Sequence, residues 1–92
     1  MKKVLLMMAF PAAVQAQVLY APNQGGGEIV LTARQCVVDG RNFDQFREAY
    51  AWSPNSSKAP ACWTVQDGNV VLIYLRDGDE RIYPLERFRE RK

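Results

Sequence analysis

The chain contains no histidine, only two cysteines and one long apolar run, and each of these scarcities narrows what it can do. Histidine is the commonest metal ligand and general base, so its absence removes the usual zinc sites and the usual Ser–His or Cys–His catalytic pairs. Nucleophilic catalysis would need an unusual Ser, Thr or Lys arrangement, and neither Ser56 nor Lys58 has a sequence context typical of one. The sequence therefore predicts no enzyme, no metal and no cofactor.

The apolar run lies near the N-terminus, from Val4 to Val14, behind two lysines. At about eleven residues it is too short to cross a bilayer core of roughly 30 Å as a helix. Val14 and Ala16 stand three and one residues before Gln17, as the small-residue rule for signal-peptide cleavage requires. We therefore expect residues 1–16 to be a signal peptide and the product to be periplasmic or secreted, without stable membrane insertion.

An excess of charge of one sign is also missing from the expected product. The chain has 12 Lys and Arg against 10 Asp and Glu, and Lys2 and Lys3 leave with the signal peptide, so ten basic residues face ten acidic ones. Binding to nucleic acid or to an anionic membrane surface requires a basic surface. Neither kind of partner is therefore expected, and residues 89–92 are predicted to be a solvated basic tail.

The two cysteines are Cys36 and Cys62. An isolated pair in an oxidising compartment usually forms a disulfide. The separation is far wider than that of a Cys-x-x-Cys redox motif, and a metal site would need further ligands. We predict a structural disulfide, which should matter because so small a domain has only a marginal core.

Turn-forming residues divide the rest of the chain. Residues 17–27 are predicted to be an extended flexible arm, because Pro22 and the run of three glycines at 25–27 oppose regular structure. The glycine run is not a typical phosphate-binding loop, since a strand-like segment follows it. Residues 28–88 are predicted to be a single small β domain.

The fold class predicted is all-β: a small antiparallel meander or barrel-like sheet of four to five strands, closed by one disulfide. The clearest strand patterns lie at 28–36, 62–65, 70–76 and 81–85. Residues 42–54 allow two interpretations. Asn42 could cap a short helix over 42–51, or residues 46–53 could form a strand, which we favour because the following segment needs a partner.

The Asp77-Gly78 pair between apolar runs is a strong hairpin signal, because both positions tolerate positive φ. A two-residue loop at this point predicts that Ile73 lies opposite Ile82. Pro84 cannot donate to a ladder of hydrogen bonds, so the last strand should lie at an edge or end there.

The segment from Val70 to Leu75 is apolar on both faces of its strand. In a lone sheet of this size, normally only one face is covered by the core. The second face would be covered within the monomer, by self-association or by a partner. Aromatic residues are also numerous, and they serve as interface anchors and sugar-stacking platforms or simply fill a small β core. The candidate interface residues are Val71, Ile73, Leu75, Trp52, Trp63, Tyr74 and Tyr83.

Three stretches carry a resemblance when taken together: GGGEIVLT at 25–32, ACWT at 61–64 and DGDERIYP at 77–84. Over about residues 25–88 the chain resembles small exported proteins of unassigned function encoded by tailed phages and prophages of Gram-negative bacteria. The resemblance implies a viral or prophage origin and a periplasmic address, and it supplies no catalytic residues.

These features predict a protein-binding module that acts on an envelope component. The expected partner is an envelope protein or a second copy of the chain. The alternative is a structural or carbohydrate-contacting accessory protein that uses exposed Trp and Tyr side chains.

Overall fold

The computed structural model describes residues 18–91 and shows one antiparallel sheet of seven strands, so the predicted signal peptide lies outside the described residues. The elements are β1 (Val18–Pro22), β2 (Glu28–Val38), β3 (Arg41–Ser53), β4 (Ser56–Gln66), β5 (Asn69–Tyr74), β6 (Glu80–Pro84), the 3-10 turn η2 (Leu85–Arg87) and β7 (Arg89–Arg91). Their order across the sheet is β6-β5-β4-β3-β2-β1-β7. Between residues 18 and 91 no helix is long and apolar enough to cross a membrane.

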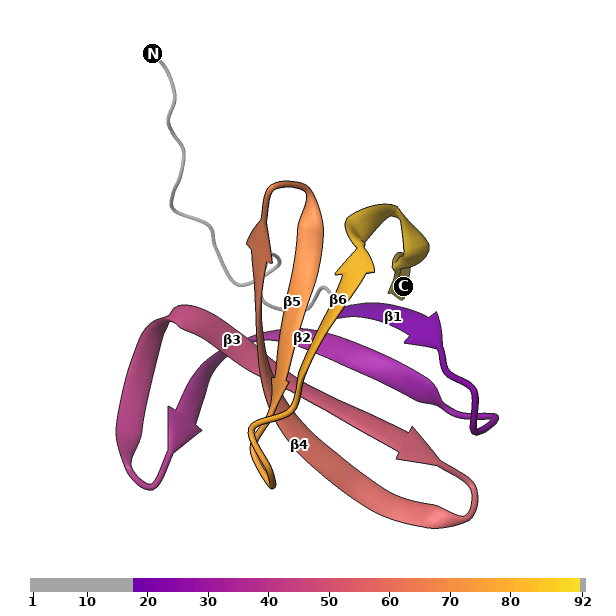
Figure 1. Cartoon of the computed structure of the whole chain (residues 1–92), viewed down its shortest axis with the longest axis horizontal. Helices are drawn as coiled ribbons and strands as arrows, with labels where there is room; N and C mark the ends of the chain where they lie inside the picture. Colours follow the sequence, from indigo (N-terminus) through magenta and orange to yellow (C-terminus); the bar gives the residue numbers. More distant parts are fainter. Residues whose placement is uncertain (1–17, 92) are drawn as a thin grey trace.

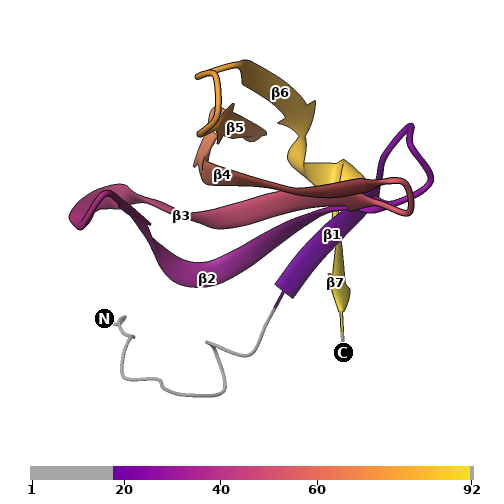
Figure 2. The same cartoon turned by 90° about the horizontal axis from the view of Figure 1, so that it is seen from below.

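The sheet curls, and η2 connects its two edge strands, β6 and β7 (Figures 1 and 2). The Leu85 N–H donates to the Gly68 carbonyl at 3.2 Å, which ties η2 to the turn between β4 and β5. The predicted all-β antiparallel sheet with a disulfide is therefore confirmed. The predicted number of strands, four to five, is wrong.

Two strands that the sequence did not predict, β1 and β7, lie at the ends of the described residues. Residues 18–22 were expected in a flexible arm, but they pair with β2, and Ala21 is buried in the core. Arg89–Arg91, expected in a solvated tail, pair with β1. Both segments are short, and β7 gains its partner only because the sheet curls to bring β1 beside it.

The ambiguous segment at 42–54 is a strand for most of its length, and the described residues contain no α-helix. Its central part has partners on both sides: Ala49 lies opposite Leu31 of β2 and opposite Ala61 of β4. The strand interpretation is confirmed, because pairing on both edges outweighs the weak helical pattern.

The core lies inside the curl and is built from alternate residues of the strands. Leu31, Leu72 and Val70 are fully buried, and Phe88 packs against the same cluster directly after η2. Ala49 and Ala61 belong to the same cluster, and an alternation of small and large inward residues suits a tightly curled sheet.

Two of the hairpin turns have the conformation that Asp-Gly predicts. Asp39 and Gly40 have φ of 53° and 78°, and Asp67 and Gly68 have φ of 54° and 78°. Positive φ at both central residues gives the turn twist that matches antiparallel strands. Pro84 is the last residue of β6, an edge strand, as predicted.

The Asp77-Gly78 turn is longer than predicted, and the register prediction is wrong. Ile82 lies opposite Val71 rather than Ile73, a shift of two residues. The reason is a wider closure, in which Gly78 N–H donates to the Tyr74 carbonyl at 2.8 Å and Tyr74 N–H donates to the Asp79 carbonyl at 2.9 Å. A shift by two keeps every side chain on its predicted face.

Candidate functional site

The far end of the β2–β3 hairpin is bent out of the plane of the sheet (Figure 1). Pairing between the strands is irregular between Leu31 and Gln35 and again between Gln35 and Cys36. Irregularities of this kind bend strands. β3 lies between β2 and β4, so residues of β2 and β4 would normally be separated by about twice the 4.8 Å strand spacing. Yet the Cα atoms of Cys36 and Cys62 are 5.8 Å apart.

The disulfide between Cys36 and Cys62 holds this bend, and its prediction is confirmed. Cys62 follows Ala61 and precedes Trp63, both of which pack in or against the core, so Cys62 lies on the outer face of the sheet. Both cysteines are buried. The disulfide therefore pins the bent hairpin against the outer face of β4.

An open apolar cavity of about 270 Å³ lies beside the bond, and we call it the apolar hollow. Its lining consists of Val38, Phe43, Phe46, Cys62, Ile73 and Leu75. The first three come from the bent hairpin and the last three from β4, β5 and the residue after β5. Phe43 and Leu75 each remain 37% exposed, which leaves apolar surface available for contact.

A second, more polar cleft of about 700 Å³ adjoins the hollow and shares Leu75 with it. Charged residues Arg34, Glu48 and Lys58 line this cleft, together with Tyr50. The Lys58 ammonium lies 4.6 Å from the centre of the Tyr50 ring, and the Thr32 hydroxyl donates to the Glu48 carbonyl at 3.1 Å. We call the hollow and the polar cleft together the outer groove.

The structure divides the three apolar candidates of the interface. Ile73 and Leu75 line the apolar hollow. Val71 is only 8% exposed and does not line it. Much of the outward face of β5 is thus covered within the monomer, and the uncovered part is concentrated at its C-terminal end.

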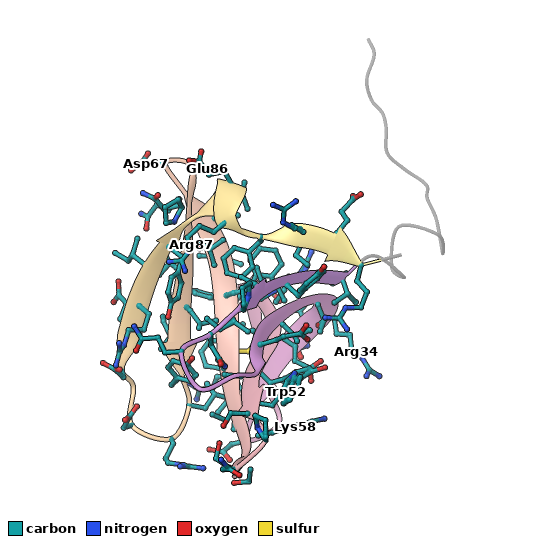
Figure 3. All side chains as sticks on the ribbon, turned by 90° about the vertical axis from the view of Figure 1, so that its right-hand side faces the viewer. Arg34, Trp52, Lys58, Asp67, Glu86 and Arg87 are labelled. Atoms are coloured by element: carbon teal, nitrogen blue, oxygen red, sulfur yellow. A yellow bond between two sulfur atoms is a disulfide. The ribbon has the colours of Figure 1, made fainter. Side chains whose placement is uncertain are left out.

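The four aromatic candidates lie elsewhere. Trp63 packs against the core, and its indole N–H donates to the Thr32 carbonyl at 2.9 Å, so it serves the fold. Tyr74 and Tyr83 also pack against the core, while their outer parts line a separate cleft. Trp52 is half-buried, and Figure 3 shows it at the same end of the molecule as Lys58.

Sequence reasoning did not find Phe43 and Phe46 as groove residues. In a regular strand, residues three apart point to opposite faces, so the two rings would not share a pocket. The irregular pairing after Phe43 brings both to the hollow. The available signal was the helix interpretation of residues 42–51, which places Phe43 and Phe46 on one face, although the structure forms a strand there.

Comparisons of the chain with protein-family models, with curated proteins and with solved structures find no match.

Proposed function

We propose that the chain is an exported protein-binding module that holds a component of the bacterial envelope in its outer groove. The observation that carries the proposal is the apolar hollow lying directly beside a charged cleft. Protein interfaces have this composition, with an apolar centre that binds anchor side chains and a polar rim around it.

The hollow can accept one large apolar side chain of a partner. Burying a Leu or Phe side chain contributes about 1.5–3 kcal/mol, which is the scale of an interface anchor. The walls are fixed before binding, because strands β4 and β5 form one side and the disulfide holds the other. A preformed pocket avoids part of the ordering cost of association.

The charges of the polar cleft would determine which residues of the partner can lie beside its apolar anchor side chain. Arg34 and Lys58 carry two positive charges and Glu48 one negative charge, and among residues 18–91 none of the three takes part in an ion pair. The partner is therefore a protein segment with one bulky apolar residue and acidic neighbours. Charges at such a rim mainly set specificity and association rate.

Export rests on the predicted signal peptide and on the resemblance to exported phage and prophage proteins. The disulfide agrees with an oxidising compartment such as the periplasm. A phage-derived protein at this address could block a receptor, inhibit a cell-wall enzyme or modulate lysis. The envelope is accordingly where the partner is sought.

The test uses the full chain with a C-terminal tag, expressed in a Gram-negative host and recovered from the mildly crosslinked envelope fraction. Leu75→Asp and Phe43→Asp place a charge in the hollow. Val65→Asp is the matched control, since Val65 is a similarly exposed apolar residue, at 46%, outside the groove. We expect one dominant envelope protein with the wild type and the control, and its loss with both hollow variants.

Recovery of the same protein with all four chains would show that the outer groove does not hold it. Mass spectrometry of the recovered chain also locates its first residue. A start at Gln17 agrees with export, whereas an unprocessed N-terminus would overturn it. Recovery of the processed chain alone, as a dimer that Leu75→Asp disrupts, would assign the groove to self-association.

A further inference from the structure

A third cleft opens at one end of the curl, on the face of the sheet opposite to the outer groove. It has a volume of about 510 Å³ and lies between the β1–β2 loop and strands β5 and β6. Its lining includes Gln24, Ile29, Tyr74, Arg81, Tyr83 and Arg87. Figure 3 shows Arg87 between β6 and the β1–β2 loop. We call this site the mouth cleft.

The walls of the mouth cleft are fixed by contacts of their own. The Asn23 side chain accepts hydrogen bonds from Gly25 N–H at 3.0 Å and Gly27 N–H at 2.9 Å, and it donates to the Trp52 carbonyl at 2.9 Å. Gly27 is required at this point, because a Cβ there would collide with the Trp52 carbonyl. The β1–β2 loop is thereby closed onto the end of β3.

The opposite wall is aromatic. The ring of Tyr83 meets Phe88 edge-on, with centroids 6.2 Å apart and planes at 77°, and the Arg87 guanidinium lies 5.7 Å over the Tyr83 ring. Tyr74 stands beside it, with its lower part packed on the core. Ring faces of this kind stack on the apolar face of a sugar.

The polar groups of the cleft are mostly unused within the described chain. The Arg81 Nε donates to Asp79 at 2.7 Å, which leaves its two terminal nitrogens unbonded to described residues. Arg87 has no carboxylate within ion-pair distance among residues 18–91. Neither tyrosine hydroxyl has a hydrogen-bond partner among those residues. Burial, followed by the proximity of Tyr83, raises the pKa of Tyr74, so its hydroxyl keeps its proton as a donor.

We propose that the mouth cleft binds an acidic saccharide, meaning a sugar that carries a carboxylate or phosphate group. Arg87 and the free nitrogens of Arg81 would hold the anionic group, for which the planar guanidinium supplies paired donors. The tyrosine rings would stack on the sugar, and the hydroxyls and Gln24 would bond its hydroxyl groups. Two guanidinium groups against one carboxylate give the cleft a net positive charge, which favours an anionic sugar over a neutral one.

This site develops the carbohydrate-contacting alternative and is independent of the outer groove. The two sites lie on opposite faces of the sheet and share no lining residue. Loss of binding at one would therefore leave the other intact. The volume lies in the range of about 300–1,000 Å³ that is usual for small-molecule pockets.

The test is an NMR titration of the full, signal-processed chain, labelled with ¹⁵N, using glucuronate, glucose 6-phosphate and glucose as probes. We expect one or both anionic sugars to shift resonances of cleft residues, with glucose at least about tenfold weaker, as loss of a charge-assisted contact implies. A response to glucuronate alone identifies a carboxylate site, and a response to glucose 6-phosphate alone identifies a phosphate site.

Arg87→Gln should weaken binding of the responsive probe about tenfold or more, whereas Arg41→Gln, an equally charge-reducing change at the first residue of β3, should leave it unchanged. The ¹H–¹⁵N spectrum of each variant verifies that it is folded. Absence of any response, equal binding of glucose, or unchanged binding by Arg87→Gln would each overturn the proposal.

Discussion

Reduction of the Cys36–Cys62 bond should lower the stability of the domain substantially. The bond joins residues separated by 26 positions. Releasing a loop of that length gives the unfolded chain enough additional entropy to lower the free energy of unfolding by about 3–4 kcal/mol. In a domain of this size that corresponds to a fall in Tm of roughly 15–30 °C.

Reduction is preferable to substitution, because it keeps both buried side chains in place. Replacing Cys36 and Cys62 by Ala would add the cost of two small cavities and confuse the comparison. Urea unfolding of the oxidised and reduced protein would be followed by circular dichroism and by tryptophan fluorescence. The Cys36→Ala/Cys62→Ala chain, with and without reductant, controls for effects of the reductant itself.

The result that refutes this reasoning is an unchanged unfolding midpoint on reduction, verified by thiol counting. It would mean that the bond does not restrict the unfolded chain enough to affect stability. A midpoint shift accompanied by a changed denaturant slope would instead indicate that the denatured state had expanded, as the entropic account requires.

Three further outcomes are expected. Leu72→Ala should lower the free energy of unfolding by about 2–5 kcal/mol in urea, because Leu72 is fully buried, whereas Ile82→Ala, at a side chain 60% exposed, should change it by about 0.5 kcal/mol or less. Trp63→Phe should cost about 1–3 kcal/mol in the same assay, since it leaves the Thr32 carbonyl without its donor. Burial raises the pKa of Tyr74, so its contribution to stability is complete below about pH 10 and is lost as the pH rises through the folded-state pKa. Thermal unfolding of Tyr74→Phe between pH 8 and pH 12 should accordingly show a shallower decline than that of the wild type.

Local chemistry predicted much of the fold. Asp-Gly pairs at 39–40 and 67–68 form turns with positive φ at both residues, and the isolated cysteine pair forms the disulfide. These features depend on a few neighbouring residues or on one strong covalent preference. The Asp77-Gly78 pair does not form the same two-residue turn. Its turn is closed by a hydrogen bond from the Gly78 N–H to the Tyr74 carbonyl, and no dipeptide pattern specifies that bond.

The parts that sequence could not predict depend on contacts between distant residues. β7 is a strand only because the curled sheet brings residues 89–91 beside residues 18–20 of β1, which itself pairs with β2. The apolar hollow exists because irregular pairing in β2 and β3 bends the hairpin across β4. A period-two pattern cannot place Phe43 and Phe46 in one pocket, since it assumes that the strand continues unbroken.

The proposed groove and the proposed address of the protein depend on each other. In a reducing compartment both cysteines would remain thiols, and nothing covalent would hold the Cα atoms of Cys36 and Cys62 at 5.8 Å across an intervening strand. The hairpin side of the hollow, with Phe43 and Phe46, would then be free to swing away from Ile73 and Leu75. If the chain is exported as we propose, such a binding site would become complete only in the oxidising compartment, and the chain would not hold its partner tightly before reaching it.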